Sequence, residues 1–141
     1  MSLTLRKART IIKQTLAKGR EAGMKPLSVA VLDAGGHPIA FEREDGASPG
    51  RFGICHGKAN GCLMLGIGGT AIQTRADNQA YFVTAMNGLY GGAFVPVKGG
   101  VLVRDGKGAI LGAIGVSGDT SDNDAIAATA GIEAAGLVAE A

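Results

Sequence analysis

Three side chains in the first half of the sequence have the chemistry to hold or transform an anionic ligand: Arg43, His56 and Lys58. A histidine pKa lies near neutrality, so His56 can ligate a metal-bearing cofactor or transfer a proton. Lys58 and Arg43 can each pair with a carboxylate. Each also has a structural interpretation: an exposed or hydrogen-bonded His56, a Lys58 whose stem covers apolar surface, and an Arg43 in a local ion pair. These three are the candidate catalytic residues.

Glycines accompany these side chains in an unusual pattern. Gly53, Gly57 and Gly61 recur every four residues and form a stripe without side chains along a predicted helix. Each glycine in a helix interior costs roughly 1 kcal/mol relative to alanine, so some contact must offset that cost. The contact is either another backbone packed closely against the stripe or a flat ligand. Gly99 and Gly100 precede a predicted strand, where backbone N–H groups can point at a carboxylate or phosphate.

Several familiar sites are excluded by their spacing. The run Gly66–Gly69 contains Gly-x-Gly, but Ala71 stands where a dinucleotide fingerprint needs its third glycine, and no Walker A motif occurs. No serine stands on a Gly-x-Ser-x-Gly turn. Cys55, His56 and Cys62 supply only three clustered soft ligands, whereas structural zinc normally takes four. We therefore predict no metal-ion site.

The composition predicts a single domain with an aliphatic core that spans residues 1–141. Glycine supplies 24 residues, far above the typical share of about 7%, while hydrophobic residues make up 46% and aromatic residues only 4%. A net charge of +2 gives no support to a nucleic-acid or membrane partner. The uncharged run 78–97 contains Pro96 and three glycines, so it would span a membrane poorly. Two cysteines and the lack of a secretory signal predict a cytoplasmic location.

Hydrophobic periodicity and turn residues predict an α+β order of elements. Glycine-containing turns at 33–37 and 105–108 each join two strands, and hairpins make antiparallel sheets. Apolar residues at helical spacing predict the helices, and Thr4 or Ser2 caps the first. An acidic segment from Asp119 precedes the last helix, with Ser121 or Asp122 as its cap. The predicted elements are a helix over 4–22, strands over 27–32 and 38–44, a helix over 51–65, one or two short helices over 70–90, strands over 101–104 and 109–116, and a helix over 125–139.

Four segments carry a resemblance to a known family. They are Val31–Ala47, the pair Lys58-Ala59, the segment 99–101 and the segment Gly112–Gly118, in this order along the chain. Together they make nearly the whole chain similar to the GlcG/HbpS-like family of haem-binding proteins. The resemblance implies a profilin-like antiparallel sheet built from β-hairpins and flanked by N-terminal, central and C-terminal helices. It also implies homo-oligomers, haem binding in some members, and kinship with a domain of PduO-type corrinoid adenosyltransferases. The chain departs from the family pattern at 60–62, where Asn-Gly-Cys stands.

These observations lead to one main hypothesis and two alternatives. The main hypothesis is a cytoplasmic homo-oligomer that binds haem or another planar or small anionic ligand. One alternative is a lyase or isomerase acting on a small aromatic or hydroxy carboxylic acid, in which Lys58 and Arg43 hold the carboxylate and His56 moves the proton. The other is an accessory protein whose glycine stripe serves subunit packing. The predicted ligand-binding residues of the main hypothesis are Lys58, His56, Gly53, Gly57, Gly61, Gly99 and Gly100.

Overall fold

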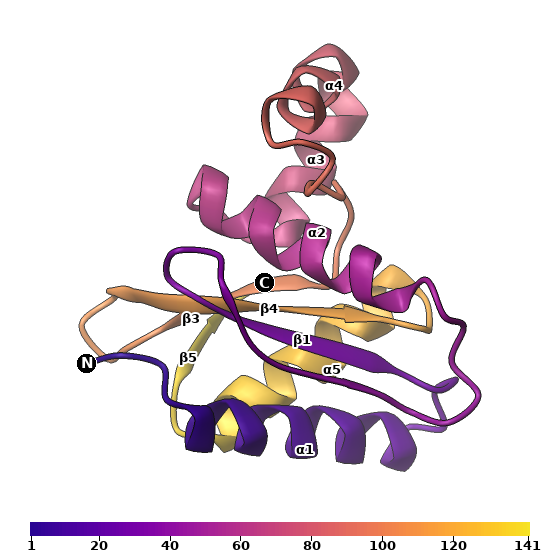
Figure 1. Cartoon of the computed structure of the whole chain (residues 1–141), viewed down its shortest axis with the longest axis vertical. Coiled ribbons are helices and arrows are strands. Elements are labelled where there is room, and N and C mark those ends of the chain that lie inside the picture. The colour runs from indigo at the N-terminus through magenta and orange to yellow at the C-terminus, as the bar shows by residue number, and fades with distance from the viewer.

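A five-stranded antiparallel sheet with helices on both faces organises the chain (Figure 1). The computed structural model describes residues 1–141, and the strand order is β2-β1-β4-β3-β5. The predicted α+β class and both predicted hairpins are confirmed. The elements are α1 (Leu5–Glu21), β1 (Ser28–Asp33), β2 (Pro38–Arg43), α2 (Arg51–Leu65), α3 (Gly69–Asn78), α4 (Ala80–Leu89), β3 (Gly100–Arg104), β4 (Ile110–Ser117), α5 (Ser121–Ala134) and β5 (Val138–Glu140).

One face of the sheet is covered by α1 and α5, which cross at a point of very close approach. The hydroxyl of Thr4 accepts a hydrogen bond from the backbone N–H of Lys7, so Thr4 caps α1 as predicted. At the crossing, a Cβ atom on Gly131 would lie 2.6 Å from the carbonyl oxygen of Ile11 and would overlap the Thr15 hydroxyl. Glycine is therefore the residue that lets the two helices pack against each other and against the sheet.

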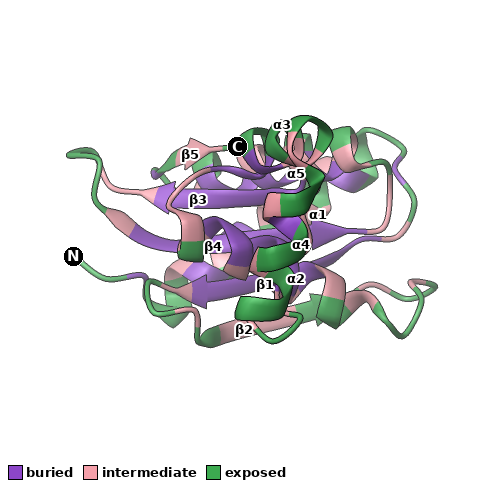
Figure 2. Ribbon diagram, turned by 90° about the horizontal axis from the view of Figure 1, so that it is seen from above, coloured by how far each residue is buried: buried purple, intermediate pink, exposed green.

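The other face is covered by α2, which lies across β1, β3 and β4. A Cβ atom on Gly115 would overlap the carbonyl of Cys55, and one on Gly100 would lie 2.8 Å from the Cys62 sulfur. Missing side chains on the strands thus bring the α2 backbone close to the sheet. Figure 2 shows the central strands β1, β4 and β3 as buried, with β2 less buried at the edge.

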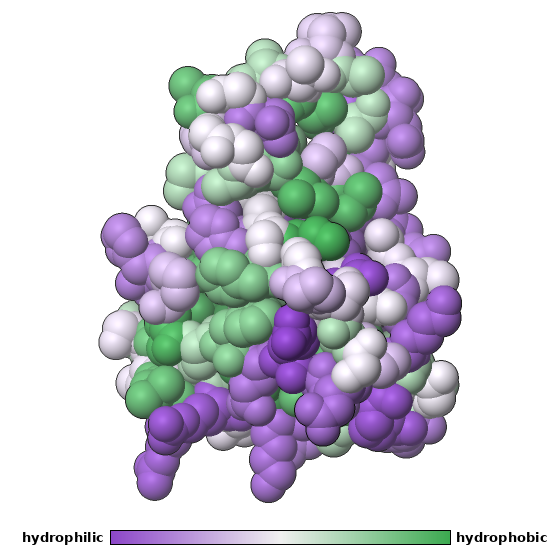
Figure 3. Space-filling view, turned by 45° about the vertical axis from the view of Figure 1, so that its right-hand side comes forward, coloured by the Kyte–Doolittle hydropathy of each residue, from purple (hydrophilic) through white to green (hydrophobic).

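Helices α3 and α4 stack beyond α2 and project away from the sheet (Figure 1). The side of α4 that faces the protein includes Val83, which is buried, and Met86, which is half-buried. Its outer side carries Tyr81 and Leu89, which are 73% and 67% exposed. Figure 3 shows hydrophobic and hydrophilic side chains mixed on this upper part of the molecule, and mostly hydrophilic ones along its lower edge. No helix in the structure has the length and apolar character needed to cross a membrane.

The C-terminal prediction is wrong in two respects. The last helix starts at Ser121, with Thr120 as its cap, and ends at Ala134 rather than continuing to residue 139. Gly136 takes a φ of +76°, a conformation that glycine tolerates, and turns the chain out of the helix. Residues 138–140 then form β5, which pairs with β3. This short strand covers the edge of β3 that would otherwise be open.

Candidate functional site

The predicted site residues divide between the interior and the surface. Lys58, Gly57 and Gly61 on α2 are buried, as are Gly99 and Gly100 in front of and within β3. Arg43 and Gly53 are exposed, and His56 is half-buried. The helix α2 therefore directs Gly57, Lys58 and Gly61 into the protein, while Gly53 and His56 lie toward solvent.

Lys58 forms a buried ion pair that sequence analysis did not reveal. Its ammonium Nζ lies 3.1 Å from Oδ2 of Asp124 and donates to the carbonyl of Val116 at 2.9 Å. The two side chains are only 4% and 2% exposed. The other carboxylate oxygen of Asp124 accepts from the backbone N–H of Asp119. Burial raises the pKa of Asp124, an effect that the positive charge of Lys58 opposes.

This pair changes the role assigned to Lys58. Because the ammonium already holds Asp124 and a carbonyl, it is not free to hold the carboxylate of an external ligand. The lyase or isomerase hypothesis used Lys58 for that purpose and lacks this anchor. The signal for Asp124 was its place in the acidic start of the last helix, where its charge was assigned to the helix dipole.

The glycine stripe on α2 is largely covered by the segment 93–97 of the same chain. A Cβ atom on Gly57 would lie 2.6 Å from Cγ2 of Val95, and one on Gly61 would lie 2.9 Å from the Phe94 ring. The backbone N–H of Val95 also donates to the carbonyl of Gly57. At Gly53, by contrast, a Cβ atom would meet nothing within 4 Å. Close packing thus offsets the cost of two of these glycines, and only Gly53 faces open space.

An aromatic cluster (Phe41, Phe52 and His56) lies where α2 passes β2. The His56 and Phe52 rings are stacked, with centroids 5.7 Å apart and planes inclined by 30°. Phe41 meets Phe52 edge-on at 5.0 Å. Phe52 is 41% exposed, and the His56 imidazole makes no hydrogen bond within the chain. Phe41 and Phe52 stand out in the sequence only because aromatic residues are rare in this chain. The sequence pattern places them in a strand and a helix and gives neither a role in a site.

Arg43 lies on the same face of β2 as Phe41. The register pairs Phe41 with Ala30 and Arg43 with Ser28, and both partners lie on the α2 side of the sheet. The Arg43 guanidinium makes no ion pair. It is therefore a positive charge without an ion-pair partner on the face of β2 that carries the aromatic cluster.

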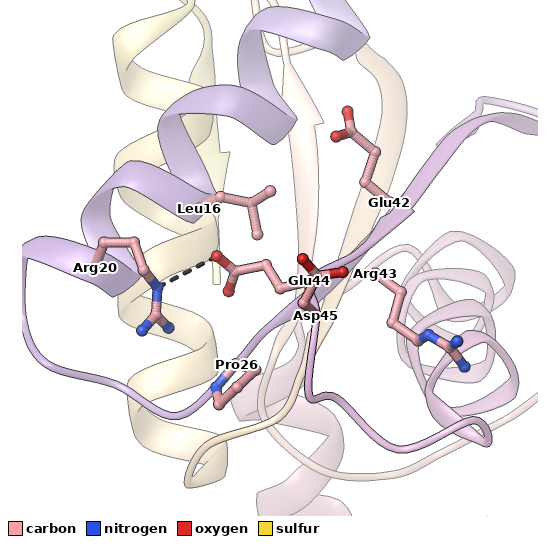
Figure 4. A pocket seen from close by; sticks show the side chains of 7 residues that line it. All are labelled: Leu16, Arg20, Pro26, Glu42, Arg43, Glu44 and Asp45. Atoms are coloured by element: carbon pink, nitrogen blue, oxygen red, sulfur yellow. Dashed lines mark ion pairs between the residues drawn. The ribbon is translucent and has the colours of Figure 1, made fainter.

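A cavity of ≈ 400 Å³ on the opposite side of β2 also touches Arg43, but its character differs. Its lining includes Glu42, Glu44 and Asp45, and Arg20 pairs with Glu44 at 3.2 Å. Figure 4 shows the Arg43 side chain leaving β2 on the side away from that ion pair. Three carboxylates disfavour an anionic ligand here, so this cavity is not the site for one.

The two cysteines point from α2 toward the sheet. Burial raises the pKa of Cys55 and of Cys62 to about 12, so both are protonated thiols at neutral pH. Cys55 donates its S–H to the carbonyl of Ser28 at 3.2 Å. No group of three or more metal-ligating side chains occurs in the structure. The cysteines therefore act as small buried residues in the packing of α2.

The fold and the sequence motifs identify the protein family of this chain. The chain belongs to the HbpS-like family, because the model described as haem degrading protein HbpS-like matches residues 3–133. No curated protein sequence matches it.

Similar solved structures extend over almost the whole chain. A PduOC:heme complex has a TM-score of 0.85 at 17% identity and covers 97% of both chains. Protein ORFY of Klebsiella pneumoniae has a TM-score of 0.83 at 24% identity, covering 94% of this chain and 90% of that one. A double mutant of HbpS from Streptomyces reticuli has a TM-score of 0.79 at 26% identity, covering 94% and 86%.

The buried ion pair makes a first prediction. Asp124→Ala leaves the Lys58 ammonium buried without a counter-charge and lowers the free energy of unfolding by about 3–5 kcal/mol. The control is Asp122→Ala, which breaks the exposed Lys98–Asp122 pair and costs less than about 1 kcal/mol. Urea unfolding followed by circular dichroism measures both changes. Equal losses in the two variants would contradict the assigned role of Lys58.

The glycine stripe makes a second prediction, in which two substitutions on one helix have opposite signs. Gly53→Ala adds a methyl group in open space and raises the free energy of unfolding by about 0.5–1 kcal/mol through helix propensity. Gly57→Ala drives the methyl group into Val95 and lowers it by about 1–3 kcal/mol. Thermal unfolding of both variants checks the prediction. A stabilising Gly57→Ala would show that segment 93–97 does not pack on the stripe.

Proposed function

We propose that the chain binds haem, or another planar ligand with an anionic group, at the aromatic cluster beside Arg43. The observation that carries the proposal is the half-exposed Phe52–His56 stack next to open space at Gly53 and an unpaired guanidinium. Membership in the HbpS-like family and the likeness to a PduOC:heme complex support haem as the ligand.

The donor set of this region fits haem. An imidazole nitrogen is a common axial ligand of haem iron, and those of His56 are not engaged by the chain. Phe52 stands beside the imidazole and is 41% exposed, so it offers an apolar contact for a flat macrocycle held by His56. Arg43 supplies the positive charge that a propionate requires. When bound, haem would supply the iron chemistry, while His56 would position it, Phe52 would exclude water beside the imidazole and Arg43 would orient the carboxylate end.

We also propose a cytoplasmic location, which the state of the two cysteines supports. Cys55 and Cys62 are both unpaired and buried, which suits a reducing compartment such as the cytoplasm.

We also propose that the protein self-associates through the outer side of α4. Tyr81 and Leu89 are mostly exposed there, and no charged residue occurs between residues 78 and 97. An uncharged, partly apolar surface matches a second copy of itself, because an isologous contact then buries no unpaired charge. The family resemblance, which implies homo-oligomers, agrees with this surface.

The haem proposal is tested by titration of the apo-protein followed at the Soret band. The wild type is expected to bind micromolar haem, and His56→Ala to bind it at least about tenfold more weakly because an iron ligand is lost. Arg43→Met is expected to weaken binding by a smaller factor. The control is His37→Ala, which removes the chain's other histidine from the exposed β1–β2 turn and leaves binding unchanged. No Soret change with the wild type would refute haem as the ligand.

The self-association proposal is tested by light scattering after size-exclusion chromatography. Leu89→Lys is expected to lower the mass to that of a smaller assembly, because two like charges would face each other across the contact. The comparison variant is Ile126→Lys, which places a charge on the 50%-exposed Ile126 of α5. A wild type that is monomeric, or an assembly broken by Ile126→Lys and not by Leu89→Lys, would rule out α4 as the interface.

A further inference from the structure

A second cavity lies where the turn between β4 and α5 meets the start of α2. It has a volume of ≈ 300 Å³ and is lined by Lys25, Arg51, Gly118, Asp119 and Thr120, with no hydrophobic side chain among them. We propose that this cavity binds a phosphate group, either as inorganic phosphate or on a small phosphate monoester. The proposal uses none of the residues of the aromatic cluster and stands independently of haem binding.

Two positive charges at this cavity have no carboxylate partner. The ion pairs of the chain engage other cations: Lys18, Arg20, Lys58, Lys98 and Arg104. Lys25 and Arg51 make no ion pair, although they come from segments 26 residues apart in the sequence and line the same cavity. Two unpaired cations that converge on a polar cavity attract an anion.

The Arg51 guanidinium is held in place before any ligand arrives. Its Nε donates to the hydroxyl of Ser48 and its Nη1 to the hydroxyl of Ser117, both at 2.9 Å. Ser117 is 1% exposed, so this anchor is part of the sheet interior. The other terminal nitrogen, Nη2, donates to no group of the chain. A guanidinium fixed on one side and free on the other loses little conformational entropy when it binds an anion.

Asp119 also lines the cavity, but its charge is already engaged. Its carboxylate accepts hydrogen bonds from the backbone N–H groups of Lys25 and Thr120 and from the side-chain amide of Asn123, at 2.7–2.8 Å. These donors hold the pKa of Asp119 at about 2. Neither the Lys25 ammonium nor the Arg51 guanidinium forms an ion pair with it, although the charge of Lys25 adds to the lowering of its pKa. The cavity therefore keeps a positive balance of two cations against one anion.

The number and type of donors favour phosphate over a simple carboxylate. Lys25, Arg51 and Thr120 each carry a side-chain donor, and they come from three separate segments that line the cavity. The Thr120 oxygen accepts from the Asn123 N–H, while its own proton donates to no group of the chain. A phosphate offers at least three acceptor oxygens and about −1.5 to −2 charge near neutral pH, so it can use all three donors.

The test is isothermal titration of the purified protein with inorganic phosphate and, separately, with glycerol 2-phosphate, at constant ionic strength in a phosphate-free buffer. The expected result is saturable one-to-one binding of at least one ligand, weakened at least tenfold in Arg51→Met and in Lys25→Met. The control is Lys107→Met, which removes an exposed, unpaired lysine from the β3–β4 turn outside the cavity and leaves affinity unchanged.

The arms of the experiment separate the outcomes. Tighter binding of the inorganic ion identifies free phosphate as the ligand, and tighter binding of the ester identifies a phosphorylated small molecule. Should Arg51→Met fold poorly because its contact with Ser117 is lost, Lys25→Met decides, since that side chain is exposed. Absence of saturable binding by both ligands, or an equal loss in Lys107→Met, overturns the proposal. Haem titration of the same variants reports on the other site separately.

Discussion

The buried Lys58–Asp124 ion pair is the constraint on which the arrangement of the two layers depends. Lys58 comes from α2 on one face of the sheet and Asp124 from α5 on the other, and they meet at the end of β4 beside the Val116 carbonyl. Moving two charges out of water is costly unless they meet with good geometry. A Cβ atom on Gly99 would lie 2.7 Å from the Lys58 nitrogen, so even the neighbouring backbone must leave room for this contact.

Because this contact fixes how α2 is rotated, it also decides what the helix presents to solvent. Cys55 and Cys62 share the inward side with Lys58, and they contact the strands. His56 and Phe52 then lie on a side that reaches the edge strand β2 and its aromatic residue. The anchoring of α2 thus places the region proposed for ligand binding at the surface, where it has no enclosed cavity of its own. This geometry explains why its binding groups come from one helix and one edge strand.

Local signals predicted most of the fold, and long-range contacts account for what they missed. The bounds of α2 and the two glycine turns follow from residues adjacent in the sequence, so they were predictable. The strand β5 was not, because residues 137–139 continue an alanine-rich helical pattern, whereas Val138–Glu140 pairs with the open edge of β3. For the proposed site, residue type alone makes His56 and Arg43 candidates. The partner of Lys58 is 66 residues away, and no local pattern connects the two.

The order of strands has a consequence for how the chain folds. The centre of the sheet joins β1 to β4, with Ser28 opposite Ser117, so its core pairing closes a loop of most of the chain. Proteins dominated by such distant pairings fold more slowly than those built from local contacts. Until β4 is available, the β1–β2 hairpin exposes apolar side chains such as Val29 and Val31, which are fully buried in the finished sheet. During synthesis, this early hairpin therefore exposes apolar surface that can aggregate before β4 emerges.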